Sequence, residues 1–130
     1  MKKLLLLTAI LICSFASYAQ DYYRIYAVTI GYLNRSTQEV DWGEDKKTEM
    51  QATIKGNVLF ISDKAQSTYT TYQELPLKDQ GGIRKQVAWR AVDENNNKCV
   101  VKLMWYYKGI QMIYIIYERY SLGYYFEYNN

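Results

Sequence analysis

Residues 85–118 constrain the fold of this chain more than any other part of the sequence. They hold three runs rich in β-branched and aromatic residues, at 85–92, 98–107 and 110–118. Such runs favour β-strands, and the short connections between them favour antiparallel hairpins. No part of the chain beyond residue 19 shows the apolar period of an amphipathic helix. The sequence therefore predicts an all-β fold organised around these three strands.

The pair Lys108-Gly109 separates the second and third runs and predicts a tight hairpin, because primed two-residue turns favour glycine at positive φ. We expect Tyr107 to pair with Ile110, which fixes the face of every residue in both strands. The predicted core face carries Cys99, Val101, Leu103, Trp105, Tyr107, Met112, Tyr114 and Ile116. We expect another element or a ligand to cover part of the opposite, mixed face, which carries Val100, Lys102, Met104, Tyr106, Gln111, Ile113, Ile115 and Tyr117.

Asparagine and aspartate fill the connection at 93–97 between the first and second runs, and both residue types tolerate the left-handed conformation of tight turns. A three-residue loop at 95–97 places Trp89 opposite Leu103 on the core face. A four-residue loop places Trp89 opposite Lys102 instead, because a shift of one residue exchanges the two faces of a strand. We therefore expect an odd-numbered loop with one Asn in the left-handed conformation.

Further segments also have the pattern of strands. The long first segment, 21–33, is expected to place on one face Tyr22, Tyr26, Val28, Ile30 and Tyr32. The polar, threonine-rich segment 66–73 has little to bury and is expected at an edge or rim of the sheet. The remaining segments are a short edge strand at 40–42 and strands at 48–54, 58–62 and 124–128.

Without the short edge strand at 40–42, these segments give seven or eight strands, with the spacing typical of antiparallel all-β proteins. We predict an up-and-down meander that closes into a small barrel or forms a strongly curled sheet. In strand count and order this arrangement resembles lipocalin-like barrels, although the sequence carries no lipocalin motif.

The first nineteen residues have the features of a secretory signal peptide. Two lysines precede an apolar run at 4–15, which is too short to span a bilayer. The small residues Ser17 and Ala19 predict cleavage between Ala19 and Gln20. We therefore expect export to the periplasm or the extracellular space, with one all-β domain over residues 20–130 and no integral membrane segment.

The composition disfavours several classes of protein. The formal net charge is +3 and falls to +1 without Lys2 and Lys3, so we expect no nucleic-acid partner. Of the two cysteines, Cys13 lies before the predicted cleavage site, and the preceding Ile12 does not suit a lipid-attachment motif. Cys99 is the one cysteine beyond that site, so no intramolecular disulfide is expected.

The sequence shows no catalytic or metal-binding constellation, and we expect neither an enzyme nor a bound cofactor. The chain has no histidine to activate Cys99 as a nucleophile, so this cysteine is expected to be a small buried apolar residue. The sequence from Asp93 begins like a calcium loop, but Lys98 replaces the required glycine and Met104 the required glutamate. The acidic residues at 39–45 are expected to be solvated.

Tyrosine and tryptophan provide the candidate binding residues. The chain holds fifteen tyrosines, which combine a large contact area with a polar hydroxyl, as many interface residues do. The alternative is that tyrosines cover half-buried sheet faces and tryptophans fill the barrel. The candidate ligand- or partner-binding residues are Trp89, Trp105, Tyr106, Tyr114 and Tyr117.

These features favour an exported, non-enzymatic binding module. Its expected partner is a small apolar or sugar-like ligand, or a protein. The long connection at 74–84 is expected near the mouth of the barrel. The alternative function is that of an inhibitor or immunity-type protein, which blocks a secreted or envelope enzyme with a loop or a sheet edge.

The nature of the barrel interior separates these functions. A cavity lined by Trp89, Trp105 and Tyr114 would favour a ligand carrier, whereas a filled interior with an exposed tyrosine face would favour a protein partner. A barrel in the outer membrane is disfavoured, because the polar segment 66–73 lacks the outward apolar band that such barrels need.

Overall fold

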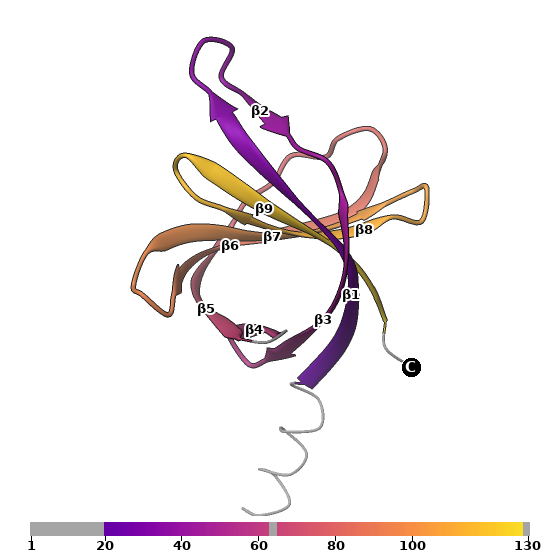
Figure 1. Cartoon of the computed structure of the whole chain (residues 1–130), viewed down its shortest axis with the longest axis vertical. Helices are drawn as coiled ribbons and strands as arrows, with labels where there is room; N and C mark the ends of the chain where they lie inside the picture. Colours follow the sequence, from indigo (N-terminus) through magenta and orange to yellow (C-terminus); the bar gives the residue numbers. More distant parts are fainter. Residues whose placement is uncertain (1–19, 63–64, 129–130) are drawn as a thin grey trace, which may run out of the picture.

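The computed structural model describes residues 20–62 and 65–128, and in this part the chain forms one antiparallel sheet of nine strands (Figure 1). The strands are β1 (Gln20–Asn34), β2 (Glu39–Trp42), β3 (Lys46–Lys55), β4 (Val58–Ser62), β5 (Gln66–Leu75), β6 (Ile83–Asp93), β7 (Lys98–Tyr106), β8 (Gln111–Ile116) and β9 (Tyr120–Tyr128). β9 returns to pair with β1, so the strands other than β2 close into a barrel. The predicted fold class is confirmed, whereas the predicted signal peptide lies outside the described residues.

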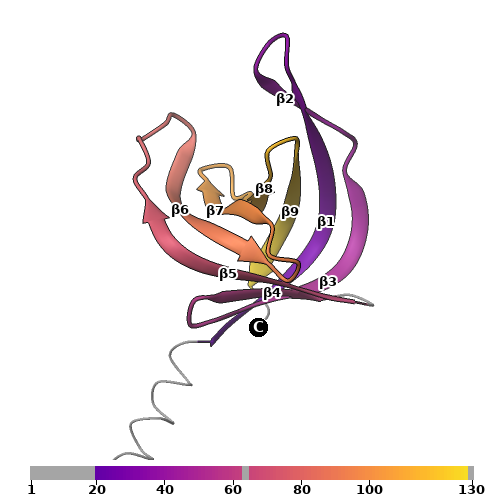
Figure 2. The same cartoon turned by 90° about the vertical axis from the view of Figure 1, so that its left-hand side faces the viewer.

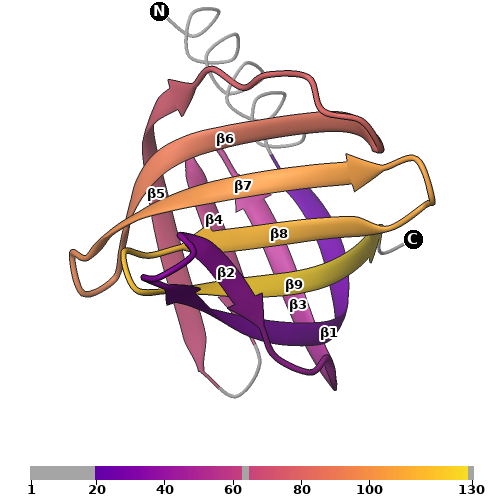
Figure 3. The same ribbon diagram turned by 90° about the horizontal axis from the view of Figure 1, so that it is seen from above.

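The barrel has two ends that carry different connections. Because neighbouring strands are antiparallel, the β3–β4, β5–β6 and β7–β8 connections leave from one end, which contains Pro76. The β4–β5, β6–β7 and β8–β9 connections leave from the other, which contains Asn96. We call these the Pro76 end and the Asn96 end. β6 to β9 cross β3 to β5 (Figure 3), as expected for tilted strands in a closed barrel.

Inward-facing side chains fill the barrel. The buried core cluster draws on every strand except β2. The ring of Phe126 packs edge-on against Tyr23 and Trp105, with centroid distances of 5.0 Å and 6.1 Å. The largest fully buried side chains are Phe126, Ile25, Ile61, Ile113, Ile115 and Val101. The interior is therefore a packed core rather than a wide ligand chamber.

The β7–β8 hairpin has a three-residue loop, one residue longer than predicted. The N–H of Tyr106 donates to the carbonyl of Ile110 at 2.9 Å, and Gly109 has a φ of 87°. This is the geometry of a hairpin with a glycine bulge, and its extra residue shifts the register by one.

The shift exchanges the two faces of β8. Leu103 pairs with Ile113 and Val101 pairs with Ile115, so both isoleucines face the core. The predicted faces of β7 are correct as far as Tyr106, but Tyr107, predicted on the core face, lies in the loop and is 71% exposed. Met112, Tyr114 and Ile116 were assigned to the wrong face and lie on the outside.

The β6–β7 hairpin has the predicted odd-numbered loop, with Asn96 in the left-handed conformation at a φ of 65°. The carboxylate of Asp93 accepts hydrogen bonds from the backbone N–H groups of Asn95 and Asn97, at 3.0 Å and 2.8 Å. Asp93 is therefore the last residue of the strand rather than part of the loop. Trp89 consequently pairs with Val101, two residues from the predicted Leu103, and an even shift keeps Trp89 on the core face.

Two predictions for the other half of the sheet were wrong. A bulge at Tyr26 interrupts the pairing of β1 with both β3 and β9, so Tyr22, Tyr26 and Val28 do not share one face. The polar segment 66–73 is not an edge, because β5 pairs with both β4 and β6 and buries Tyr69 to 3% exposure. The predicted short edge strand at 40–42 is confirmed as β2, which pairs only with β1 among the described strands.

Candidate binding surfaces

The five candidate residues from the sequence do not form one site. Trp89 and Trp105 face the interior, where Trp105 is buried and carries the ammonium of Lys85 5.0 Å from its ring centroid. Tyr106 and Tyr114 lie together on the outer face, while Tyr117 lies at the Asn96 end. The structure therefore divides the candidates among three separate places.

β2 covers part of the outer face of the barrel through Trp42. Gly31 pairs with Trp42 across the β1–β2 ladder, and the indole lies over Gly31 and Gly123. A Cβ atom added at Gly31 would lie 2.7 Å and 2.9 Å from atoms of this ring. The indole also contacts Tyr114 of β8, with ring centroids 5.5 Å apart. Because the two glycines have no side chains, the Trp42 ring of the edge strand can lie directly against the outer face of the barrel.

Tyr106 and Tyr114 are locked together beside this tryptophan. Their hydroxyl oxygens lie 2.9 Å apart, so one hydroxyl donates to the other. The hydroxyl of Tyr114 lies 2.9 Å from Sδ of Met112, and that of Tyr106 lies 3.6 Å from Sδ of Met104. Burial, followed by the hydrogen bond to Tyr106, raises the pKa of Tyr114 above its ordinary value. The hydrogen bond between the two hydroxyls therefore holds both rings in place, and Tyr114 stays uncharged at neutral pH.

An open depression of about 430 Å³ continues this surface toward the β7–β8 loop. Tyr107 and Ile110 stand at its border with 71% and 40% of their side chains exposed. Tyr125 of β9 forms another wall and contacts Tyr26, with ring centroids 6.0 Å apart. We define the aromatic face as Trp42, Tyr106, Tyr107, Ile110, Met112, Tyr114 and Tyr125.

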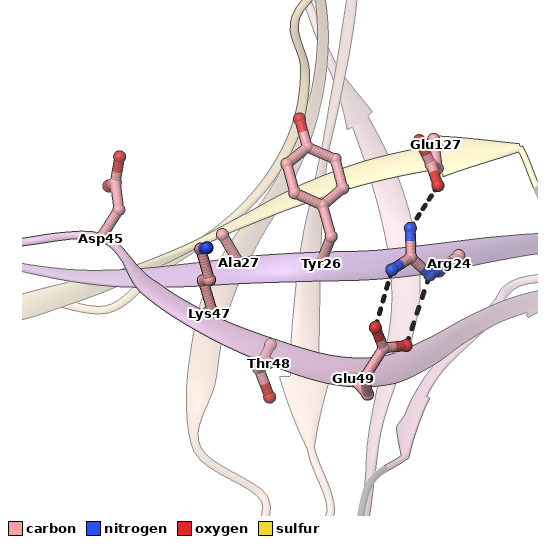
Figure 4. A pocket seen from close by; sticks show the side chains of 8 residues that line it. All are labelled: Arg24, Tyr26, Ala27, Asp45, Lys47, Thr48, Glu49 and Glu127. Atoms are coloured by element: carbon pink, nitrogen blue, oxygen red, sulfur yellow. Dashed lines mark hydrogen bonds and ion pairs between the residues drawn. The ribbon is translucent and has the colours of Figure 1, made fainter.

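Figure 4 shows a charged groove of about 770 Å³. It adjoins the aromatic face, because Tyr26 of its lining contacts Tyr125. Arg24 lies between Glu49 and Glu127, and its Nε and Nη2 atoms donate to the two oxygens of Glu49 at 3.3 Å and 2.7 Å. The hydrogen bond from Arg24 lowers the pKa of Glu49, and the two glutamates raise the pKa of Arg24. The charges of Arg24, Glu49 and Glu127 are paired with one another. The groove is therefore a polar border of the aromatic face rather than an isolated ion site.

Hydrogen-bonded tyrosines occupy the interior at the Asn96 end. The hydroxyl of Tyr117 donates to Oδ2 of Asp93 at 2.8 Å, and Tyr69 is hydrogen-bonded to both Tyr117 and Tyr124. Desolvation raises the pKa of Asp93, but the bonds from Asn97, Tyr117 and Asn95 outweigh it and hold the pKa below its ordinary value. Tyr117 is therefore part of a structural network that closes this end.

The Pro76 end contains a smaller pocket of about 210 Å³ that reaches the interior. Its inner wall consists of the inward-facing side chains of Trp89, Val101 and Leu103. The turn between β3 and β4 borders its mouth. Of the candidate residues, Trp89 alone lines this pocket.

Burial raises the pKa of the Cys99 thiol to about 11, so it stays protonated and poorly nucleophilic at neutral pH. Within residues 20–62 and 65–128, no three His, Cys, Asp or Glu side chains come together to hold a metal ion. The same residues contain no helix long and apolar enough to cross a membrane.

Sequence reasoning missed Trp42 and Tyr125 as surface residues. The sequence places Trp42 in a short edge strand but does not predict its contact with β8, because this contact depends on two glycines that are far apart in the sequence. The face of Tyr125 depends on the register of the last strand, which begins at Tyr120 rather than at the predicted Tyr124. Comparison of the chain with protein-family models, curated proteins and solved structures found no match.

Proposed function

We propose that this chain is an exported, non-enzymatic binding module whose aromatic face binds a protein partner. The observation that carries this proposal is an apolar, tyrosine-rich depression on the outside of a barrel whose interior is filled. Outer faces of small barrels are ordinarily solvated and polar, so an aromatic cluster there is a candidate contact surface.

The composition of the aromatic face suits a protein partner. Tyrosine, tryptophan and methionine are enriched at protein interfaces, and tyrosine and tryptophan are among the residues that contribute most of the binding energy. Lys108 borders the depression, and the Arg24 group lies next to it. An apolar centre with a charged border is the usual anatomy of a specific interface.

The aromatic face is also organised before any partner binds. The Tyr106 and Tyr114 hydroxyls are bonded to each other, and the Trp42 ring rests on Tyr114. Side chains that are already held in place lose little conformational entropy on binding, which favours affinity. This organisation supports a dedicated surface rather than incidental exposure of apolar side chains.

An inhibitor or immunity-type protein is the second candidate function. The β1–β2 hairpin projects beyond the rest of the barrel (Figure 2) and carries Tyr32, which is 63% exposed. Inhibitors often block a target with one projecting segment, and this hairpin carries Trp42 of the aromatic face at the end of β2. The two functions share one surface and differ in whether the partner is an enzyme that loses activity when bound.

A matched pair of variants tests the aromatic face. The double variant Tyr107→Ser, Ile110→Ser removes two exposed side chains from the depression, whereas Tyr72→Ser removes a 58% exposed tyrosine from β5 on another part of the barrel. A companion protein that co-purifies stoichiometrically with the unmodified chain should be retained by Tyr72→Ser. It should lose at least about tenfold in affinity for the double variant, as expected for removal of interface anchors. Equal retention by both variants would overturn the proposal.

The proposed export has its own test. The intact mass of protein recovered from the periplasm or the medium should correspond to a chain that begins at Gln20. Recovery of the full-length chain from the cytoplasm alone would contradict export. This result would leave the aromatic face untouched, because the two proposals rest on different residues.

A further inference from the structure

We propose that the interior pocket at the Pro76 end is a second binding site, separate from the aromatic face, which takes a small neutral apolar molecule of about one ring. The two sites lie on opposite faces of the sheet. The pocket is lined by inward-facing residues, and the aromatic face by outward-facing ones.

The floor of the pocket is part of the packed core. Leu59, Val101 and Leu103 are buried, so their positions are fixed by the barrel itself. Ile54 and Trp89 are half-buried and form the sides nearer to solvent. The site therefore combines a rigid apolar floor with a flat indole wall, against which a ring can pack.

The polar groups at the mouth of the pocket are already paired with each other. The backbone N–H and the hydroxyl of Thr71 both donate to the carbonyl of Asn57, at 2.8 Å and 3.0 Å. The side-chain amide of Asn57 donates in turn to the carbonyl of Thr71 at 3.1 Å. These bonds hold the β3–β4 turn against β5, so the mouth is preformed. None of the described residues that line the pocket has a charged side chain that could pair with a ligand carboxylate.

The size of the pocket limits the ligand. Apolar cavities of about 150 Å³ bind a single benzene ring, so a volume of about 210 Å³ accepts one ring with a small substituent. Sites for larger ligands usually occupy roughly 300–1,000 Å³. An extended lipid or a multi-ring molecule does not fit, because the surrounding core is filled.

Toluene and benzoate form a matched pair of probes, since they share a ring and differ in charge. Titration of the isotope-labelled protein with toluene should shift the NMR signals of the Trp89 indole and of the Ile54 and Leu103 methyl groups in a saturable manner. The indole signal of Trp42 should stay in place. Benzoate should bind at least about tenfold more weakly, because burying an unpaired carboxylate is costly.

A variant pair locates the site. Ile54→Trp fills the pocket and should weaken toluene binding at least about tenfold. Ile30→Trp makes the same substitution at an inward-facing, 40% exposed position toward the Asn96 end, and should leave binding unchanged. If Ile54→Trp does not fold, the toluene and benzoate titrations of the unmodified protein decide the question. Unsaturable shifts, shifts centred on Trp42, or equal binding of benzoate would each overturn the proposal.

Discussion

Two neighbouring residues of β9 show that inward-facing side chains stabilise the barrel, whereas outward-facing ones are available for binding. Phe126 points inward and is nearly inaccessible between Tyr23 and Trp105, whereas Tyr125 points outward and lines the depression of the aromatic face. Successive side chains of a strand face opposite sides of a sheet, so aromatic neighbours in sequence have different roles. The inner aromatic side chains fill the core, and the outer ones form a surface that a partner can contact.

Truncation of these two residues should separate the roles. Phe126→Ala should lower the free energy of unfolding by about 3–5 kcal/mol, because it leaves a cavity in the core. Tyr125→Ala removes a half-buried side chain and should cost only about 1 kcal/mol. The measurement is chemical denaturation of both variants under the same conditions. Similar losses for the two variants would contradict the inner and outer assignments.

The next largest loss of stability should come from a substitution of Gly31, beneath the Trp42 ring. Gly31→Ala places a methyl group within 3 Å of the Trp42 ring and of Val40, and overpacking of this kind costs about 1–3 kcal/mol. The emission of Trp42 should shift to longer wavelength as the ring is displaced. Gly81→Ala is the control, because an added Cβ there meets no atom within 4 Å. A Gly31 variant as stable as the Gly81 variant would mean that Trp42 does not rest on β1.

The smallest effect should be a pH dependence at the Asn96 end. The pKa of Asp93 is depressed in the folded protein, so its stabilising contribution is present above its ordinary pKa of about 3.9. That contribution is lost as the pH falls through the lower folded pKa. The stability difference between the unmodified protein and Asp93→Asn should stay constant from about pH 7 to pH 5 and shrink below about pH 4.

Tyr117→Phe is the partner variant for this test, because it removes one hydrogen bond to Asp93 and leaves those from Asn95 and Asn97. It should therefore reduce the pH dependence without abolishing it. A difference for Asp93→Asn that grows as the pH falls would contradict the assigned direction.

The sequence alone predicted the fold class. It also predicted which residues of β3, β6 and β7 face inward, because the apolar pattern of these strands is regular. It failed for β8 because one extra residue in the loop after Tyr106 reverses every face of the strand. It failed similarly for β1 at the Tyr26 bulge. Strand periodicity is a local property, whereas loop geometry and bulges are fixed by hydrogen bonds that local patterns do not specify.

The candidate sites were less predictable than the fold. Tyr106 and Tyr114 were identified as candidates, yet their contact arises only with the observed β7–β8 register. With the predicted register they would have faced opposite sides of the sheet. The role of Trp42 depends on Gly31 of β1 and Gly123 of β9, which barrel closure brings onto neighbouring strands.

Native mass spectrometry of the unmodified protein, isolated from its own compartment, tests the central claim most directly. The proposed function predicts a stoichiometric complex with another protein, which dissociates when Tyr107 and Ile110 are both replaced by serine. A bare monomer, or a complex that survives this double substitution, would contradict binding through the aromatic face.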